Sequence, residues 1–214
     1  MIRLLVFICA LPSIASAGPL VADSGDDVGS LAAFCKSLDT ATTCAIADDD
    51  KIADLAKPAA PYLAARIFWA GDSITAPDNQ CYVGLKTKQT WTVASLGSDC
   101  WSNGKYSRRL EVKELAVRPA SSDLWLRYAI ESSDPDVEGT VTEEFLVICG
   151  LAEGLPRCTA PIALGLASDG KPKWKVKATL SKAGALVLAV EKGKRAALPA
   201  ETAALLGKTS LSFE

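Results

Sequence analysis

The chemistry available to this chain is set by its cysteines and by its lack of histidine: it has seven cysteines and no histidine. Cysteine side chains form disulfides or, as thiolates, bind metals and attack electrophiles. Six of them lie beyond residue 17 and follow one another as three close pairs, Cys35 with Cys44, Cys81 with Cys100, and Cys149 with Cys158. The spacing predicts three local disulfides, although sequence alone cannot choose among the possible pairings. Disulfides indicate an oxidising compartment.

The lack of histidine excludes the common nucleophilic centres, because no group of matched pKa remains to accept a proton from a serine or a cysteine. A zinc site would need the cysteines that the disulfides consume, so we expect no metal and no cofactor. Carboxylate pairs remain as candidate catalytic groups. Glu143 and Glu144 are neighbours on an expected strand and point to opposite faces, whereas Glu131 and Glu138 flank a loop. A carboxylate-dependent polysaccharide hydrolase is therefore an alternative function rather than the favoured one.

An acidic loop resembles the first half of a calcium-binding loop. Asp134, Asp136 and Glu138 stand at alternate positions and are followed by Gly139, but Phe145 stands where a bidentate glutamate is required. The pattern favours a polar turn between strands.

A basic strand is the first candidate binding feature. Lys173, Lys175 and Lys177 alternate with Trp174 and Val176, so a strand would place three ammonium groups on one face and apolar groups on the other. Such a face could bind an anionic polysaccharide of the cell envelope. The alternative is protection of an edge strand, where lysines prevent aggregation.

The second candidate is the segment between Cys149 and Cys158, which contains Leu155, Pro156 and Arg157. A disulfide across so short a loop would order it in advance, which lowers the entropy cost of docking into a partner's cleft. An inhibitor that acts on a hydrolase through this loop is the other alternative function. An ordinary stapled turn would explain the same residues.

The N-terminal segment has the anatomy of a signal peptide. Arg3 is followed by an apolar stretch at residues 4–11 and by Ala15, Ser16 and Ala17, which predicts cleavage after Ala17 and export to the periplasm or the exterior. Cleavage removes one arginine and no acid, so the formal net charge changes from -2 to -3. We expect no nucleic acid partner, and no apolar run is long enough to span a membrane.

Residues 18–70 indicate broken helices. Apolar residues recur at helical spacing in residues 26–38, a second helix is expected from residue 48 to 56, and residues 62–69 would resume the pattern after Pro58 and Pro61.

Residues 71–214 are typical of a β domain. Runs of β-branched and aromatic residues predict strands at 82–87, 90–96, 108–117, 124–131, 140–149, 162–166, 173–180 and 185–191, and a helical turn at 198–207 leads into a strand at 210–213. A change of phase predicts a bulge near Lys113 and Glu114. The similar segments 84–93 and 165–176 would fit a duplicated β-unit with a break near 150–160, or a chance match.

These patterns together predict an α+β protein with a helical N-terminal segment and a mainly antiparallel core of about eight or nine strands, arranged as a sandwich or in a barrel-like form. The predicted function is a secreted or periplasmic, non-enzymatic binding or envelope-associated module. Its expected partner is another envelope or secreted protein, or an anionic polysaccharide.

Overall fold

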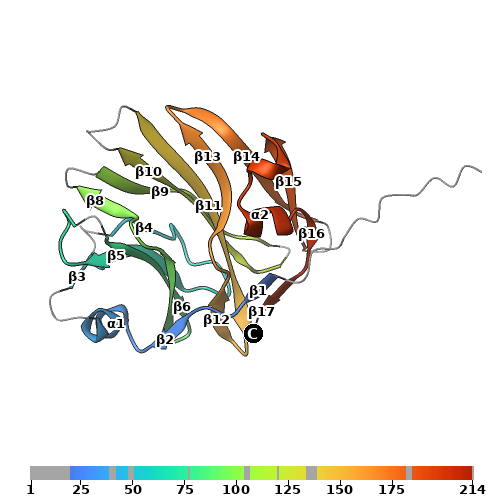
Figure 1. Cartoon of the computed structure of the whole chain (residues 1–214). Helices are drawn as coiled ribbons and strands as arrows, with labels where there is room; N and C mark the ends of the chain where they lie inside the picture. Colours follow the sequence, from blue (N-terminus) through green and yellow to red (C-terminus); the bar gives the residue numbers. More distant parts are fainter. Residues whose placement is uncertain are drawn as a thin grey trace, which may run out of the picture.

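The computed structural model describes residues 20–38, 42–47, 51–76, 78–103, 107–119, 121–133, 139–181 and 185–213. The expected leader at 1–17, the expected helix start at 48–50 and the acidic loop at 134–138 lie outside these residues. The described chain is mainly β and its two large sheets are antiparallel (Figure 1). A small parallel pair, β1 (Leu20–Ala22) with β17 (Leu211–Phe213), joins segments from the two ends of the described chain.

The smaller of the two large sheets has the strand order β2-β7-β6-β5-β3, with β4 beside β5. Its strands are β2 (Asp26–Val28), β3 (Thr43–Cys44), β4 (Ala53–Asp54), β5 (Ala64–Gly71), β6 (Gln80–Thr87) and β7 (Thr90–Gly97). Helix α1 (Leu31–Ser37) packs Leu31 and Phe34 against Phe68 and Val93 on one face of this sheet. The helix begins at Ser30, whose Oγ accepts a hydrogen bond from the amide of Ala33 at 3.0 Å.

The larger sheet has the order β16-β15-β14-β13-β11-β10-β9-β8, with β12 also paired to β11. Its strands are β8 (Trp101–Asn103), β9 (Ser107–Val117), β10 (Leu124–Ser133), β11 (Thr140–Ala152), β12 (Leu155–Cys158), β13 (Ile162–Ser168), β14 (Lys171–Leu180), β15 (Leu186–Lys192) and β16 (Gly207–Thr209). The sheet curls into a half-barrel, and α2 (Ala200–Ala204) follows a short 3₁₀ turn at Arg195–Ala197 (Figure 1).

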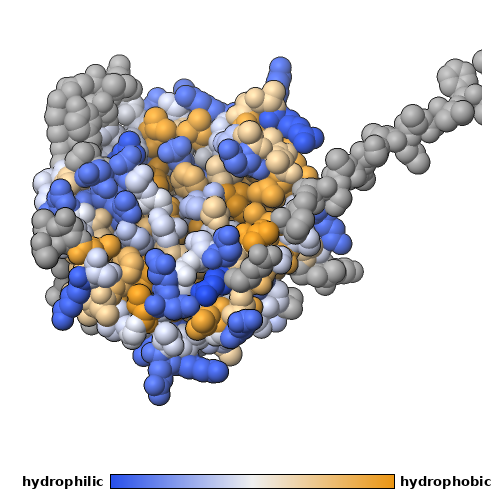
Figure 2. All heavy atoms as spheres, turned by 60° about the horizontal axis from the view of Figure 1, so that its bottom comes forward, coloured by the Kyte–Doolittle hydropathy of each residue, from blue (hydrophilic) through white to orange (hydrophobic). Residues whose placement is uncertain are grey.

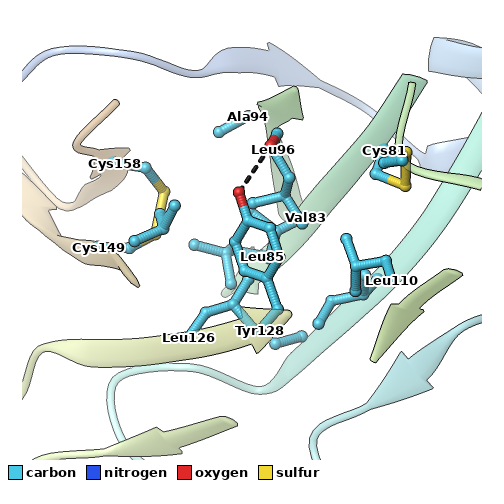
Figure 3. Close-up of a cluster of buried hydrophobic side chains, with 14 of the residues drawn as sticks. Cys81, Val83, Leu85, Ala94, Leu96, Leu110, Leu126, Tyr128, Cys149 and Cys158 are labelled. Atoms are coloured by element: carbon cyan, nitrogen blue, oxygen red, sulfur yellow. Dashed lines mark hydrogen bonds between the residues drawn. A yellow bond between two sulfur atoms is a disulfide. The ribbon is translucent and has the colours of Figure 1, made fainter. Parts of the chain in front are cut away.

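The first core lies between the two large sheets. Strand β10 contributes alternate side chains, Leu124, Leu126 and Tyr128, which pack with Val83 and Leu85 of β6 (Figure 3). Two buried tyrosine hydroxyls also cross this core. Tyr128 donates to the carbonyl oxygen of Leu96 at 2.6 Å, and Tyr62 donates to that of Cys149 at 2.8 Å.

The second core lies within the half-barrel. It uses the other side of β10 and β11, through Trp125 and Ile148, together with Leu164, Trp174 and Leu188. Several residues that pack against this core are only partly buried, namely Leu20, Leu205, Leu211 and Phe213. In Figure 2 an apolar area extends over the surface of the protein from the centre of the view to the right. This is the side of the molecule on which α2, β1 and β17 lie in Figure 1.

The expected helices of the N-terminal segment are wrong, except for one short helix. Residues 64–71 form β5. This apolar run is buried on both faces, by α1 on one side and by the first core on the other. A run buried on both faces loses the alternation that would separate a strand from a helix. Residues 53–54 pair with β5 as β4, and residues 26–28 pair with β7 rather than beginning the helix.

The expectations for the β region are confirmed in their main lines. Each expected strand overlaps an observed one, with ends that differ by a few residues. In the pairing of β9 with β10, Arg127 lies opposite Glu114 and Tyr128 opposite Val112, which makes Lys113 the extra residue of the expected bulge. The similar segments 84–93 and 165–176 both fall in antiparallel hairpins, of different sheets, and the duplication stays a prediction.

Candidate functional site

All three expected disulfides are formed. Cys35 bonds to Cys44, Cys81 to Cys100 and Cys149 to Cys158. Three disulfides in one chain indicate an oxidising extracellular or periplasmic environment. Among the residues that the structure describes, no helix is long and apolar enough to cross a membrane.

The expected lysine face is present on β14. Trp174 and Val176 are buried in the second core, whereas Lys173 and Lys177 are exposed and Lys175 is partly exposed. Strand β14 lies between β13 and β15, but β13 pairs with its residues 171–175 and β15 with its residues 175–180. Of the three lysines, Lys175 therefore has a paired strand on both sides, and protection of an edge does not explain this lysine. We call Lys173, Lys175, Lys177 and the adjacent Lys192 the lysine face.

A row of residues crosses four strands at the centre of the lysine face. Gly165 of β13 is opposite Glu144 of β11 on one side and Lys175 of β14 on the other, and Lys192 of β15 is opposite Lys175. Because glycine has no side chain, the Lys175 ammonium reaches over β13 to the Glu144 carboxylate, with an N–O distance of 3.4 Å. The directly opposed Lys175 and Lys192 carry like charges, an arrangement that costs stability.

The segment from Cys149 to Cys158 is a tight hairpin. Cys149 and Cys158 are directly opposite in the β11–β12 register, and the chain reverses at Glu153 and Gly154, which both have positive φ. Thr87 of β6 donates to the carbonyl oxygen of Gly154 at 3.5 Å, so the tip of the hairpin rests on the smaller sheet. The strand pairing and the expected disulfide both close this hairpin, and its ordering in advance for a partner stays a prediction.

The residues considered for docking in this hairpin make contacts within the protein. Pro156 is buried and Leu155 is partly buried. Both terminal nitrogens of Arg157 donate to the Asp27 carboxylate, at 3.2 and 3.1 Å, and this bond, helped by one from Thr92, holds the pKa of Asp27 below its usual value. Since 130 positions separate Arg157 from Asp27, no local sequence signal could have revealed this pair.

Of the carboxylates considered for catalysis, the neighbours Glu143 and Glu144 lie on opposite faces of β11, as expected. Glu144 is paired with Lys175, and Glu138 lies outside the described residues. Asp72 and Asp78 line a hollow of about 300 Å³ beside Tyr82, and both are exposed. The buried carboxyl group is Asp123, 6 % exposed, and burial raises its pKa.

No group of three or more potential metal ligands occurs among the described residues. Comparisons of the chain with protein-family models, with curated proteins and with solved structures gave no match. The geometry of the protein's surfaces is therefore the guide to its function.

Proposed function

We propose that this protein is a non-enzymatic binding module of an extracytoplasmic compartment, and that its lysine face holds an anionic polysaccharide of the cell envelope. The observation that supports the proposal is the position of the basic strand. Lys175, the central lysine of this strand, has paired strands on both sides, where a lysine is not needed to prevent edge-to-edge pairing. An anionic ligand gives these charges a role.

The arrangement of the ammonium groups suits an extended polymer. Successive lysines on one face of a regular strand repeat about every 7 Å, twice the rise per residue, as Lys175 and Lys177 do; Lys173 is the extra residue of a bulge in the pairing with β13. Lys192 adds a second row beside Lys175. Because the whole chain has a formal net charge of -2, this attraction is local, and we expect binding to weaken steeply as salt increases.

The proposal can be tested by retention on an immobilised anionic polysaccharide such as heparin or alginate. Changing Lys173, Lys175 and Lys177 together to Gln should lower the salt concentration needed for elution. At about 0.5 kcal/mol for each exposed charge contact, the affinity should fall roughly tenfold.

A matched control separates the lysine face from net charge. Lys36, Lys57 and Lys88 are exposed residues on other parts of the chain, and their joint change to Gln alters the net charge by the same amount. This control should elute with the unaltered protein. Equal losses in the two triple variants, or no retention of the unaltered protein at low salt, would contradict the proposal.

Export through the leader is the second part of the proposal. Cleavage after Ala17 would leave Gly18 as the first residue of the exported protein. N-terminal sequencing and intact-mass measurement of protein collected from the periplasm or the medium test this directly. A protein retained with its leader in the cytoplasm would contradict it.

A further inference from the structure

A second hollow lies at one end of the half-barrel, between the turn that joins β9 to β10 and the end of β14. Its volume is about 330 Å³, and it is lined by Arg118, Pro119, Trp125, Ala178, Thr179 and Leu180. Most of these side chains are apolar. The volume lies in the range of small-molecule sites, which favour the mouths of barrels.

Trp125 of this hollow carries a polar group that the fold leaves without a partner. The residue is 2 % exposed, its ring packs in the second core, and its indole Nε1 has no hydrogen-bond partner among the described residues. A buried donor without an acceptor costs about 1–3 kcal/mol. The cost is recovered if a bound molecule supplies the acceptor.

The rim of the hollow favours an anion. The Arg118 guanidinium lies over the Trp125 ring, 4.9 Å from its centroid, and also bonds to the Glu114 carboxylate. Arg127 is directly opposite Glu114 in the β9–β10 register. Arg118 is the charged side chain among those that line the hollow, and Arg127 places a second positive charge beside the Glu114 carboxylate, outside that lining.

We propose that this hollow binds a small amphiphilic anion, a molecule with an apolar body and one carboxylate. The apolar body would lie against Trp125, Ala178 and Leu180, and the carboxylate would bond to Arg118 and accept the indole N–H. Because Nε1 is shielded from solvent, binding must shift the side chains around it. The proposal does not depend on the lysine face.

The indole N–H resonances of ¹⁵N-labelled protein provide a direct readout. Octanoate and benzoate are the probes, and 1-octanol is the uncharged match for octanoate. The Trp125 resonance, assigned with Trp125→Phe, should move downfield with a carboxylate probe and stay in place with 1-octanol. A preference for octanoate indicates an acyl ligand, and a preference for benzoate indicates an aromatic one.

Three variants test the role of the rim, with affinity taken from the same titration. Arg118→Gln should weaken binding of the preferred probe at least tenfold, whereas Glu114→Gln should strengthen it several-fold, because the guanidinium loses its competing carboxylate. Lys113→Gln, on the same strand, is the control and should change nothing. Binding should also be unchanged in the lysine-face variant, which separates this proposal from the preceding one.

Three results would overturn the inference. The first is a Trp125 resonance that stays in place with both carboxylates in large excess. The second is equal binding of octanoate and 1-octanol, and the third is equal affinity of the unaltered protein and Arg118→Gln; either of these two would remove the role of Arg118 in binding an anion.

Discussion

The hydroxyl of Tyr128 offers the sharpest test of how the two large sheets are held together. In the pairing of β6 with β7, Cys81 lies opposite Gly97 and Tyr82 opposite Ser95, so Leu96 is an extra residue without an opposite residue in β6. The Tyr128 hydroxyl donates to the carbonyl oxygen of this residue at 2.6 Å across the core (Figure 3). The Tyr128 hydroxyl therefore gives a hydrogen-bond donor to the carbonyl oxygen of a residue that has no opposite residue in β6.

Changing Tyr128 to Phe removes the donor and keeps the ring. The ring is 1 % exposed and stacks on Phe145, with centroids 5.3 Å apart, so its packing should survive the change. The Leu96 carbonyl oxygen would be left buried without this donor, which costs about 1–3 kcal/mol. For a chain of this size, that loss lowers the melting temperature by roughly 2–4 °C for each kcal/mol.

Urea unfolding, followed by tryptophan fluorescence and by circular dichroism, measures the loss. Tyr82→Phe is the matched control, because the Tyr82 hydroxyl donates to an exposed acceptor, Gln80 Oε1, at 2.7 Å. That variant should lose less than about 0.5 kcal/mol. If Tyr128→Phe were as stable as Tyr82→Phe, with an unchanged slope against urea, the reasoning about the Leu96 carbonyl would be refuted.

Three further changes should alter stability in predictable ways. Asp123→Asn should raise the melting temperature at neutral pH. Burial raises the pKa of Asp123, so ionisation of this group disfavours the folded state. The gain should vanish below the ordinary pKa of aspartate, where Asp123 is protonated in both the folded and the unfolded state. Arg157→Gln should cost about 0.5–1 kcal/mol at neutral pH, and this difference should disappear as acid titrates Asp27, whose pKa the arginine lowers; a loss independent of pH would contradict the ion pair. Replacing Cys149 and Cys158 by Ala should cost about 3 kcal/mol in denaturant unfolding, as expected for so short a loop, and no loss would show that the hairpin closes without its disulfide.

The sequence predicted the β region well because its strands keep an alternation of large apolar residues with polar or small ones, even along β10, where Trp125 faces the second core. Along β10, Leu124, Leu126 and Tyr128 face the first core, and their alternation could be recognised without knowing their partners. The prediction failed at β5, where Phe68 faces α1 while Ile67 and Trp69 face the first core. Because consecutive residues at 67–69 are all large and apolar, no alternation remains there to mark a strand.

The candidate sites could be predicted only as far as they lie on one strand. The three lysines of β14 could be recognised by their alternation with Trp174 and Val176. The residues that lie opposite these lysines could not be predicted, because the row from Glu144 through Gly165 to Lys175 depends on the register of three strands. The register follows from packing between distant segments, and a single sequence contains no local signal for it.

The position of strand β11 between the two cores affects how the protein unfolds. It pairs with β10, β12 and β13, and its alternate residues, such as Val147 and Ile148, belong to different cores. Neither core can lose its packing without exposing one face of this strand. The first and second cores should therefore melt in a single cooperative step, and the amides of β11 should be among the last to exchange with deuterated solvent.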